Sequence, residues 1–406
     1  MKEGWKEYRL YDLAKVTMGL SPKGDSYNNS NIGIGLLNGP TEFGDTFPDC
    51  TLYTTDPKRI CKKGDLIFCV RGSTTGRMNW ADKPYALGRG VCSIRGKDDL
   101  TTKFLKHLLT NNLPALLQIT GGGTFPNLRK EDINGFKFEA PSSYKKIAAI
   151  LSAYDDLIEN NLRRIKLLEE KAQITYEEWF VRMKFPGHES TPINEETGLP
   201  EGWRNLTLGD FLTLNYGKAL KAGERIPGPF KVYGSSGEVG THNKALIEGP
   251  GVIVGRKGNV GSVFWEPKDF YPIDTVYYVS SDVSLYFCYY NLKGQRFINN
   301  DAAVPGLNRS SAYLHKSFLP SKSILEKFDL VVEDLFDLSE NYKKQNQLLK
   351  EARDILLPRL MTGMIDVDQL DLSAFENGDG DKMLMAAEPE GSYSIKKKND
   401  EVINQN

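Results

Sequence analysis

The chain repeats most of its sequence pattern once, and this internal repeat limits the possible folds more than any other feature. Gly4-Trp5 opens a stretch that recurs from Gly202-Trp203. A repeat of about 180 residues is too long for the unit of a solenoid, so it predicts two similar domains, each followed by a helix. Two similar but non-identical halves suit a target with two non-identical parts. The later matches set Arg71, Gly76, Trp80, Pro126, Leu128 and Leu167-Leu168 against Arg256, Gly261, Trp265, Pro305, Leu307 and Leu348-Leu349.

Length and composition place the chain among soluble globular proteins. Its 406 residues, 40% hydrophobic and 26% charged, predict two or three domains. No apolar run approaches the roughly 18 residues of a membrane span, and the first residues lack the apolar region of a signal peptide. The five cysteines form no C-x-x-C pair, which disfavours a disulfide framework or a zinc site. We therefore expect a cytoplasmic protein.

The net charge of -1 hides an uneven distribution. Residues 366–406 carry ten acidic and four basic side chains, so residues 1–365 have a net charge of +5. A mildly basic body is weakly compatible with nucleic-acid binding. The acidic segment is poor in apolar residues, which predicts a disordered tail over residues 364–406.

Two long helices are predicted where apolar residues recur at alternating spacings of four and three. The expected fold is a mixed α/β (α+β) protein in which two globular domains are joined by two long antiparallel coiled-coil helices. Pro358 should bend or end the second helix in its last turn, and Gly363 should cap it. The predicted segments are a first globular domain (1–143), a central helix (144–182), a linker (183–201), a second globular domain (202–322), a distal helix (323–363) and the tail (364–406).

The two apolar seams fit one another if the helices are antiparallel. This register sets Asn161 opposite Asn346, and a single buried asparagine layer is a known device for fixing register. About 36 helical residues span roughly 54 Å, and a DNA turn is about 34 Å, so the helices could hold two DNA-reading domains one to two turns apart. The alternative is that each helix packs only on its own domain. The predicted interface consists of Ile147, Leu151, Ile158, Asn161, Ile165, Trp179, Phe328, Leu335, Asn346, Leu349, Leu356 and Leu360.

Motifs of catalysis are missing from the sequence. It contains no phosphate-binding G-x-x-x-x-G-K-S/T and no N/D-P-P-Y/F/W tetrapeptide of an amino-methyltransferase. The four histidines show no metal-ligand spacing. Glu169-Glu170-Lys171 resembles a nuclease E-x-K but is expected on a solvated helix face. Gly121-Gly122-Gly123-Thr124 lacks dinucleotide spacing and is expected to be a surface loop. We therefore expect no catalytic residue, no metal site and no cofactor bound by this chain.

Basic and hydroxyl side chains gather in two matching loops that follow apolar strands. Arginine can bind guanine or phosphate with two parallel hydrogen bonds, and Ser, Thr and Asn can bind base edges or the backbone. The alternative is an ordinary hairpin with solvated charge. The candidates in these loops are Arg71, Ser73, Thr74, Thr75, Arg77, Arg256, Lys257 and Asn259. Further candidates for contact with DNA are Arg129, Lys130, Lys218, Lys221, Ser235 and Ser236.

Several segments, in the expected order, resemble the specificity subunits of type I restriction–modification systems. Residues 145–158, with the sequence KKIAAILSAYDDLI, are similar to the central spacer helix of that family. Residues 199–203 (LPEGW) are similar to the start of its second target recognition domain, and residues 356–363 (LLPRLMTG) to the end of its distal helix. Residues 122–128 (GGTFPNL) resemble a loop late in its recognition domains. The resemblance covers residues 4–365.

The resemblance implies a role in recognising double-stranded DNA. Each recognition domain would read one half of a split, asymmetric sequence, and the helices would set the gap and help to dock two methyltransferase subunits. Those partners would use S-adenosylmethionine to methylate adenine, and motor-endonuclease subunits would cut DNA with ATP and Mg²⁺. The chain itself would be non-catalytic. It departs from the family in the lead-in at residues 140–144 and in the acidic tail. The alternatives are a scaffold that joins two interaction domains and a fragment of a restriction enzyme.

Overall fold

The computed structural model describes residues 4–119, 126–297 and 306–368. The glycine-rich segment at 121–124 and nearly all of the acidic tail lie outside these ranges. The chain divides into two compact units, one formed by residues 1–162 with the segment from 343 onward, the other by residues 163–342. The predicted boundaries separated the helices from the globular domains, whereas each compact unit contains a globular domain with half of both long helices. The reason is that each half-helix packs on the domain beside it.

The first unit is built around an antiparallel four-stranded sheet in the order β2-β9-β6-β7. All four residues of its inner strand β6 are buried, as expected for a short continuous apolar run. Asp98 caps α2 by accepting a hydrogen bond from Thr101 N at 2.8 Å. The main sheet comprises β2 (Ala14–Met18), β9 (Val91–Gly96), β6 (Leu66–Cys69) and β7 (Met78–Trp80). A second sheet comprises β3 (Tyr27–Asn28), β5 (Tyr53–Thr54), β4 (Ile34–Leu37) and β8 (Ala86–Leu87), and β1 (Trp5–Arg9) pairs with β10 (Lys137–Pro141). The helices are α1 (Leu10–Leu13), α2 (Asp99–Asn111), α3 (Leu113–Gln118) and α4 (Lys130–Gly135).

The second unit repeats this plan. Its four-stranded sheet has the order β12-β18-β15-β16, which matches the first unit strand for strand. The sequence repeat is therefore a repeat of the fold. This sheet comprises β12 (Thr213–Tyr216), β18 (Val276–Ser280), β15 (Gly251–Gly255) and β16 (Val263–Glu266). The remaining strands are β14 (Gly237–His242), β13 (Phe230–Gly234), β17 (Phe270–Pro272), β11 (Arg204–Thr207) and β19 (Lys316–Leu319), and the short helices are α6 (Leu285–Gly294) and α7 (Arg309–Tyr313).

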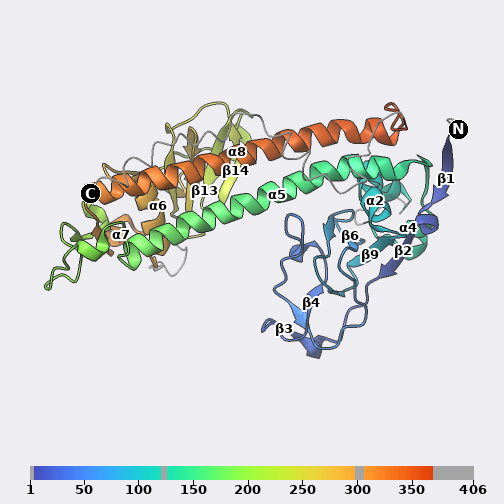
Figure 1. The fold of residues 1–406 in the computed structure, drawn as a ribbon, viewed down its shortest axis with the longest axis horizontal. Helices are drawn as coiled ribbons and strands as arrows, with labels where there is room; N and C mark the ends of the chain where they lie inside the picture. The colour runs from blue at the N-terminus through green and yellow to red at the C-terminus, as the bar shows by residue number, and fades with distance from the viewer. Residues whose placement is uncertain (1–3, 120–125, 298–305, 369–406) are drawn as a thin grey trace. The chain divides into compact units, whose positions relative to one another are not determined.

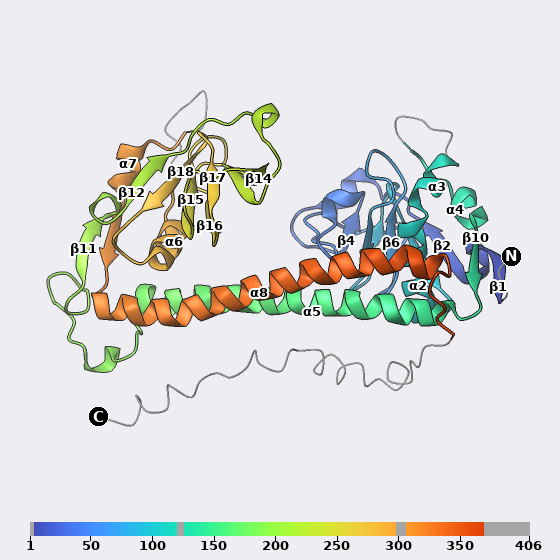
Figure 2. The same ribbon diagram turned by 90° about the horizontal axis from the view of Figure 1, so that it is seen from above.

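Two long helices, α5 (Tyr144–Tyr176) and α8 (Lys322–Met361), run side by side in opposite directions (Figures 1 and 2). In the first unit, Asn161 Nδ2 donates to Asn346 Oδ1 at 3.0 Å, and Asn346 Nδ2 donates to Ile158 O at 3.3 Å. The structure thus brings together the two asparagines that the antiparallel register sets opposite one another. In the second unit, Arg164 Nη1 donates to the Tyr342 hydroxyl at 3.1 Å.

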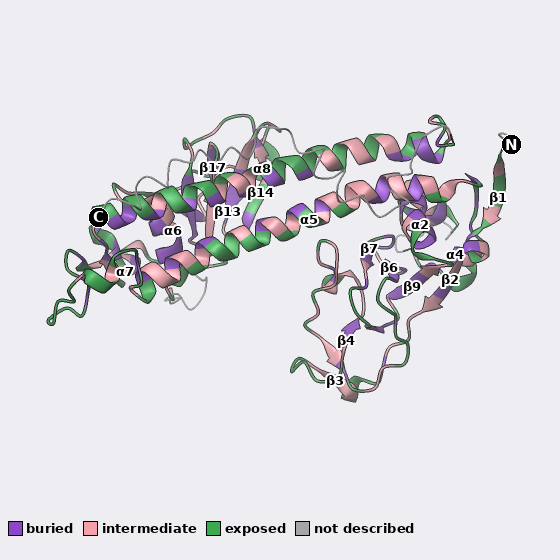
Figure 3. Ribbon diagram, viewed as in Figure 1, coloured by how far each residue is buried: buried purple, intermediate pink, exposed green. Residues whose placement is uncertain are grey.

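The buried faces of the helices follow most of the predicted seam (Figure 3). Near the end of α5 the seam moves by one residue: Phe180 is fully buried, whereas Trp179 is half-buried. The shift begins at Tyr176, the last residue of α5, which is buried while Thr175 is half-buried, and a π-helical turn over Glu177–Val181 follows it. The α-helix ends at residue 176, and the helical path continues as this π-helical turn to residue 181, one residue short of the predicted end at 182. The predicted seam residues that are buried are Ile147, Leu151, Ile158, Asn161, Ile165, Phe328, Leu335, Asn346 and Leu360.

The end of α8 also differs from the expected pattern. Leu349 and Leu356 are half-buried, while the neighbouring Leu357 is buried in the core of the first unit. Pro358 lies inside the helix without ending it. Gly363 takes a positive φ of 65°, the backbone conformation of a helix cap. Within the described residues, no helix has both the length and the apolar character needed to cross a lipid bilayer.

Candidate nucleic-acid interface

The loop between β6 and β7 exposes arginine and hydroxyl side chains on a well-anchored backbone. Leu128 N donates to Val70 O at 2.9 Å, and Gly72 N donates to Pro126 O at 3.1 Å. Thr75 Oγ1 donates to Gly72 O at 2.8 Å and to Pro126 O at 3.2 Å. Thr75 is buried, so this candidate holds the loop together and does not face a ligand. Thr74 is half-buried, while the side chains of Arg71, Ser73 and Arg77 are exposed.

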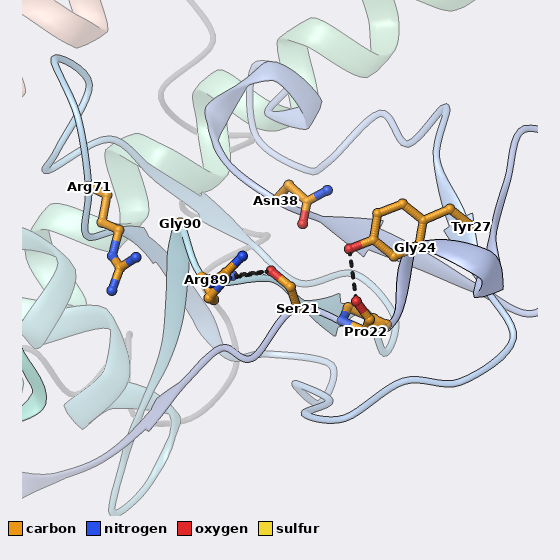
Figure 4. A pocket seen from close by; sticks show the side chains of 8 residues that line it. All are labelled: Ser21, Pro22, Gly24, Tyr27, Asn38, Arg71, Arg89 and Gly90. Atoms are coloured by element: carbon orange, nitrogen blue, oxygen red, sulfur yellow. Dashed lines mark hydrogen bonds between the residues drawn. The ribbon is translucent and has the colours of Figure 1, made fainter.

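Arg71 lines a surface hollow of about 680 Å³ together with a second arginine, Arg89 (Figure 4). Arg89 Nε donates to Ser21 Oγ at 3.2 Å. Four segments that are distant in the sequence supply the walls of the hollow, and none of its lining residues is acidic. Two guanidinium groups that are always charged therefore face a space without a compensating carboxylate in its lining. The complete lining is Ser21, Pro22, Gly24, Tyr27, Asn38, Arg71, Arg89 and Gly90.

Sequence reasoning missed Arg89. The signal that could have found it is an arginine flanked by two glycines, Gly88 and Gly90, which lies between two apolar strands. It was not selected because its partners in the hollow come from separate segments with no sequence pattern in common. Only the folded chain brings Asn38 and Tyr27 beside it.

In the second unit, the loop between β15 and β16 has the same anchoring but a different residue alignment. Leu307 N donates to Arg256 O at 2.8 Å, as Leu128 N does to Val70 O. Lys257 forms an isolated bridge with Gly306, as Arg71 does with Asn127. Lys257 is therefore the structural counterpart of Arg71, and the match of Arg71 with Arg256 that the sequence suggested is wrong by one residue.

The cause of this shift is a shorter turn in the second unit. Gly76 N donates to Cys69 O at 2.9 Å, and Gly261 N donates to Gly255 O at 2.9 Å. Equivalent hydrogen bonds thus close a turn that is one residue shorter in the second unit. When the two sequences are aligned on Gly76 and Gly261, the gap for the missing residue falls before the arginine and not after it. Arg71 is then matched with Arg256 in place of Lys257.

Arg256 is held against the protein. Its Nη1 donates to Asp274 O at 2.8 Å, and its guanidinium lies 4.8 Å from the centre of the Tyr216 ring. Arg309 lies 5.1 Å from the same ring. Burial, followed by a hydrogen bond with Tyr216, raises the pKa of the Tyr277 phenol. The half-buried Arg256 is thus part of an arginine–tyrosine cluster, which leaves Lys257 as the exposed cation of this loop.

The second unit also brings two predicted loops together. Asn259 Nδ2 donates to Ser236 Oγ at 3.3 Å, and Ser262 Oγ donates to Ser235 O at 2.7 Å. The candidates Ser235, Ser236 and Asn259 therefore form one polar edge beside Lys257.

The remaining basic candidates are exposed. Arg129 and Lys130 begin α4 directly after Leu128, which is bonded to the loop that carries Arg71. Lys218 and Lys221 lie after β12, and the structure records no hydrogen bond from their side chains within the described ranges. The first pair thus lies close to the Arg71 loop, while the second pair is not joined to the loop at residues 256–261.

Comparison with known proteins gives the family context. The model of the type I restriction modification DNA specificity domain matches residues 2–170 and again residues 200–317. The specificity subunit of the type I restriction enzyme MjaIX of Methanocaldococcus jannaschii is 26% identical over 346 residues, which cover 77% of this chain and 80% of that protein. The HindI specificity subunit of Haemophilus influenzae is 22% identical, with 89% and 99% covered.

A solved structure shares the fold. The S subunit of a type I restriction-modification system from M. genitalium superposes with a TM-score of 0.56 at 21% identity, covering 88% of this chain and 96% of that one. The two family matches fall on the two halves of the internal repeat described above.

Proposed function

Because the chain belongs to the family of type I restriction–modification DNA specificity subunits, we propose that it reads a bipartite, asymmetric sequence in double-stranded DNA. Each globular domain reads one half of the target. The observation that supports this proposal is that both domains share one backbone arrangement but carry different side chains at equivalent positions. Arg71 in the first domain corresponds to Lys257 in the second, in loops with the same anchoring bonds. Equal frames with unequal side chains suit two unequal half-sites.

The paired helices act as a spacer between the two reading domains. The Asn161–Asn346 hydrogen bond supports this role, because a buried asparagine layer penalises any slip of one helix along the other. A second polar contact in the same unit, Arg353 Nη1 to Asp155 Oδ1 at 2.7 Å, also fixes the register. A defined register gives the target a defined gap.

The helices also dock two methyltransferase subunits. Leu167 and Ile174 on α5 are 63% and 56% exposed and lie seven residues apart, hence on one helix face. Leu348 and Ile355 on α8 are 56% and 55% exposed with the same spacing. The internal repeat makes these two pairs equivalent. Two equivalent exposed apolar pairs suit two copies of one partner, since exposed leucines and isoleucines at such spacing are typical of helix contact surfaces.

The partners carry the chemistry, and this chain is non-catalytic. The methyltransferase subunits bind S-adenosylmethionine and methylate adenine at N6. Motor-endonuclease subunits supply cleavage with ATP and Mg²⁺, and the assembly works in the cytoplasm. The absence of methyltransferase and nuclease motifs from the sequence supports this division of labour.

Duplex binding at varied salt tests the DNA-reading role. The complex with the methyltransferase subunit should bind genomic duplex fragments with an affinity that falls steeply with salt, since phosphate contacts release counterions. Six or more phosphate contacts correspond to a loss of about a thousandfold between 50 and 200 mM salt. A complex that assembles but shows no salt-dependent binding would support the alternative of a protein scaffold.

A further inference from the structure

The hollow beside Arg71 contains an arginine that the structure holds ready for a ligand. Arg89 lies on the connection between β8 and β9, and its backbone N donates to Ser21 Oγ at 3.3 Å while its Nε donates to the same oxygen at 3.2 Å. One hydroxyl thus accepts from both the backbone and the Nε of the same arginine, which restrains the side chain up to its guanidinium. The Arg89 side chain lines the hollow together with that of Arg71 (Figure 4).

The backbone on both sides of Arg89 is clamped. A Cβ at Gly88 would lie 2.1 Å from Asn38 Oδ1, and a Cβ at Gly90 would lie 2.0 Å from Asn38 O. Only glycine fits at position 90, where the clash is with the backbone, while a side chain at position 88 would force the Asn38 side chain to move. Gly88 N also donates to Leu37 O at 2.8 Å, and Val70 N donates to Gly90 O at 2.9 Å. Arg89 therefore projects from a rigid support, the arrangement that recognition of a defined geometry requires.

The second domain carries the opposite charge at this place. Gly217 N donates to Val276 O as Gly19 N does to Val91 O, and Arg256 N donates to Thr275 O as Val70 N does to Gly90 O. These bonds make Asp274 the counterpart of Arg89. A residue that only held the fold or only neutralised phosphate would have no reason to reverse its charge between two copies of one frame. A residue that discriminates between bases is expected to differ in this way, because the two domains read different half-sites.

Resting on the proposed function, we propose that Arg89 is a specificity-determining residue of the first domain and reads a guanine in the DNA half-site. Two parallel N–H donors match the O6 and N7 acceptors of guanine in the major groove. A single oriented guanidinium with Nε already engaged presents this pair of donors. Asn38 and Tyr27 also line the hollow, and Arg71 supplies a second positive charge to it.

The test compares methylation motifs of variants made in complex with the methyltransferase subunit, in a host without DNA methylation. Arg89→Ala should relax the requirement for guanine at one position of one half-site, lowering discrimination there roughly 5- to 160-fold. The other half-site should stay unchanged, which also shows that the variant complex is folded and active. Arg89→Lys should not restore discrimination, because an ammonium keeps the charge but lacks the two parallel donors.

Arg59→Ala is the matched control, since Arg59 is an exposed arginine of the same unit that does not line the hollow. It should leave every position of the motif unchanged. An Arg89→Ala complex that methylates more slowly with all specified positions intact would overturn the inference and assign Arg89 to phosphate. Full rescue by Arg89→Lys would overturn it as well. A wild-type complex without any sequence motif would instead remove the proposed function itself, and the inference with it.

Discussion

Replacing Arg353 should lower the free energy of unfolding of the first unit. The loss should exceed the contribution of an exposed ion pair. Asp155 on α5 contacts three cationic or ionisable groups: Arg353 Nη1 at 2.7 Å, Lys106 Nζ at 2.6 Å and His107 Nε2 at 3.3 Å. Burial raises the pKa of the Asp155 carboxyl and the Lys106 ammonium lowers it, and the net result is a pKa below the ordinary value. The carboxylate is therefore charged in the folded protein. Its contacts join α5 to α8 and to α2 of the recognition domain.

The magnitude follows from burial. Removing one partner of a buried pair costs about 3–5 kcal/mol when the remaining charge is left unpaired, and Asp155 here keeps its contact with Lys106, which lowers the cost. Side-chain exposures of 23% for Arg353 and 18% for Asp155 reduce this to about 2–3 kcal/mol. Arg353→Met keeps the apolar stem of the side chain, so the loss in free energy of unfolding measures the contribution of the charge and its hydrogen bonds.

The assay is chemical denaturation of the wild type and the variant, followed by helix content and by tryptophan fluorescence. The matched control is Lys137→Met, which breaks a pair with Glu7 at a similar distance of 2.9 Å but with both side chains 54% exposed. It should cost no more than about 1 kcal/mol. If Arg353→Met destabilises the protein no more than Lys137→Met does, the reasoning from burial is wrong. The double variant with Asp155→Asn should lose less than the sum of the single losses, since the two residues share one contact.

Three further predictions concern pH, register and spacing. Burial lowers the pKa of His107 to about 4 from the ordinary 6.5, so the unfolded chain binds more protons than the folded one between these values. The free energy of unfolding should therefore fall as the pH drops from about 6.5 to about 4, by roughly 3 kcal/mol in all, and a pH series of thermal melts should show His107→Gln without this decline. Replacing Asn161 and Asn346 together by leucine should raise stability but permit slipped helix pairing; a double variant with one unchanged methylation gap and an unchanged melting temperature would contradict this. Inserting one heptad into both α5 and α8 adds about 10 Å and should widen the permitted gap by about three base pairs, whereas an unchanged gap in the mapped motif would show that the helices do not set the spacing.

The sequence predicts those features that depend on local periodicity or on the repeat. The matched strand orders of the two sheets follow from two copies of one pattern. The long helices follow from apolar spacing, and the pairing of Asn161 with Asn346 follows from aligning two seams. These relations need no knowledge of loop conformation.

The features that sequence reasoning missed depend on loops and on tertiary packing. Arg89 lies in a hollow built by four separated segments, so no local pattern marks it. The one-residue shift that pairs Lys257 with Arg71 arises from a shorter turn, which hydrogen bonds reveal and residue types conceal. At the end of α5, Phe180 packs against Phe287 and Phe328, with ring centres 5.1 and 4.8 Å away. This packing favours the π-helical turn over the regular seam.

The measurement that tests the account most directly is a genome-wide map of N6-methyladenine made by the wild-type chain with its methyltransferase partner in a methylation-free host. The account predicts one asymmetric motif with two specified halves and a fixed unspecified gap between them. A continuous motif, a variable gap, or no methylation with a partner that is active on another specificity subunit would contradict it.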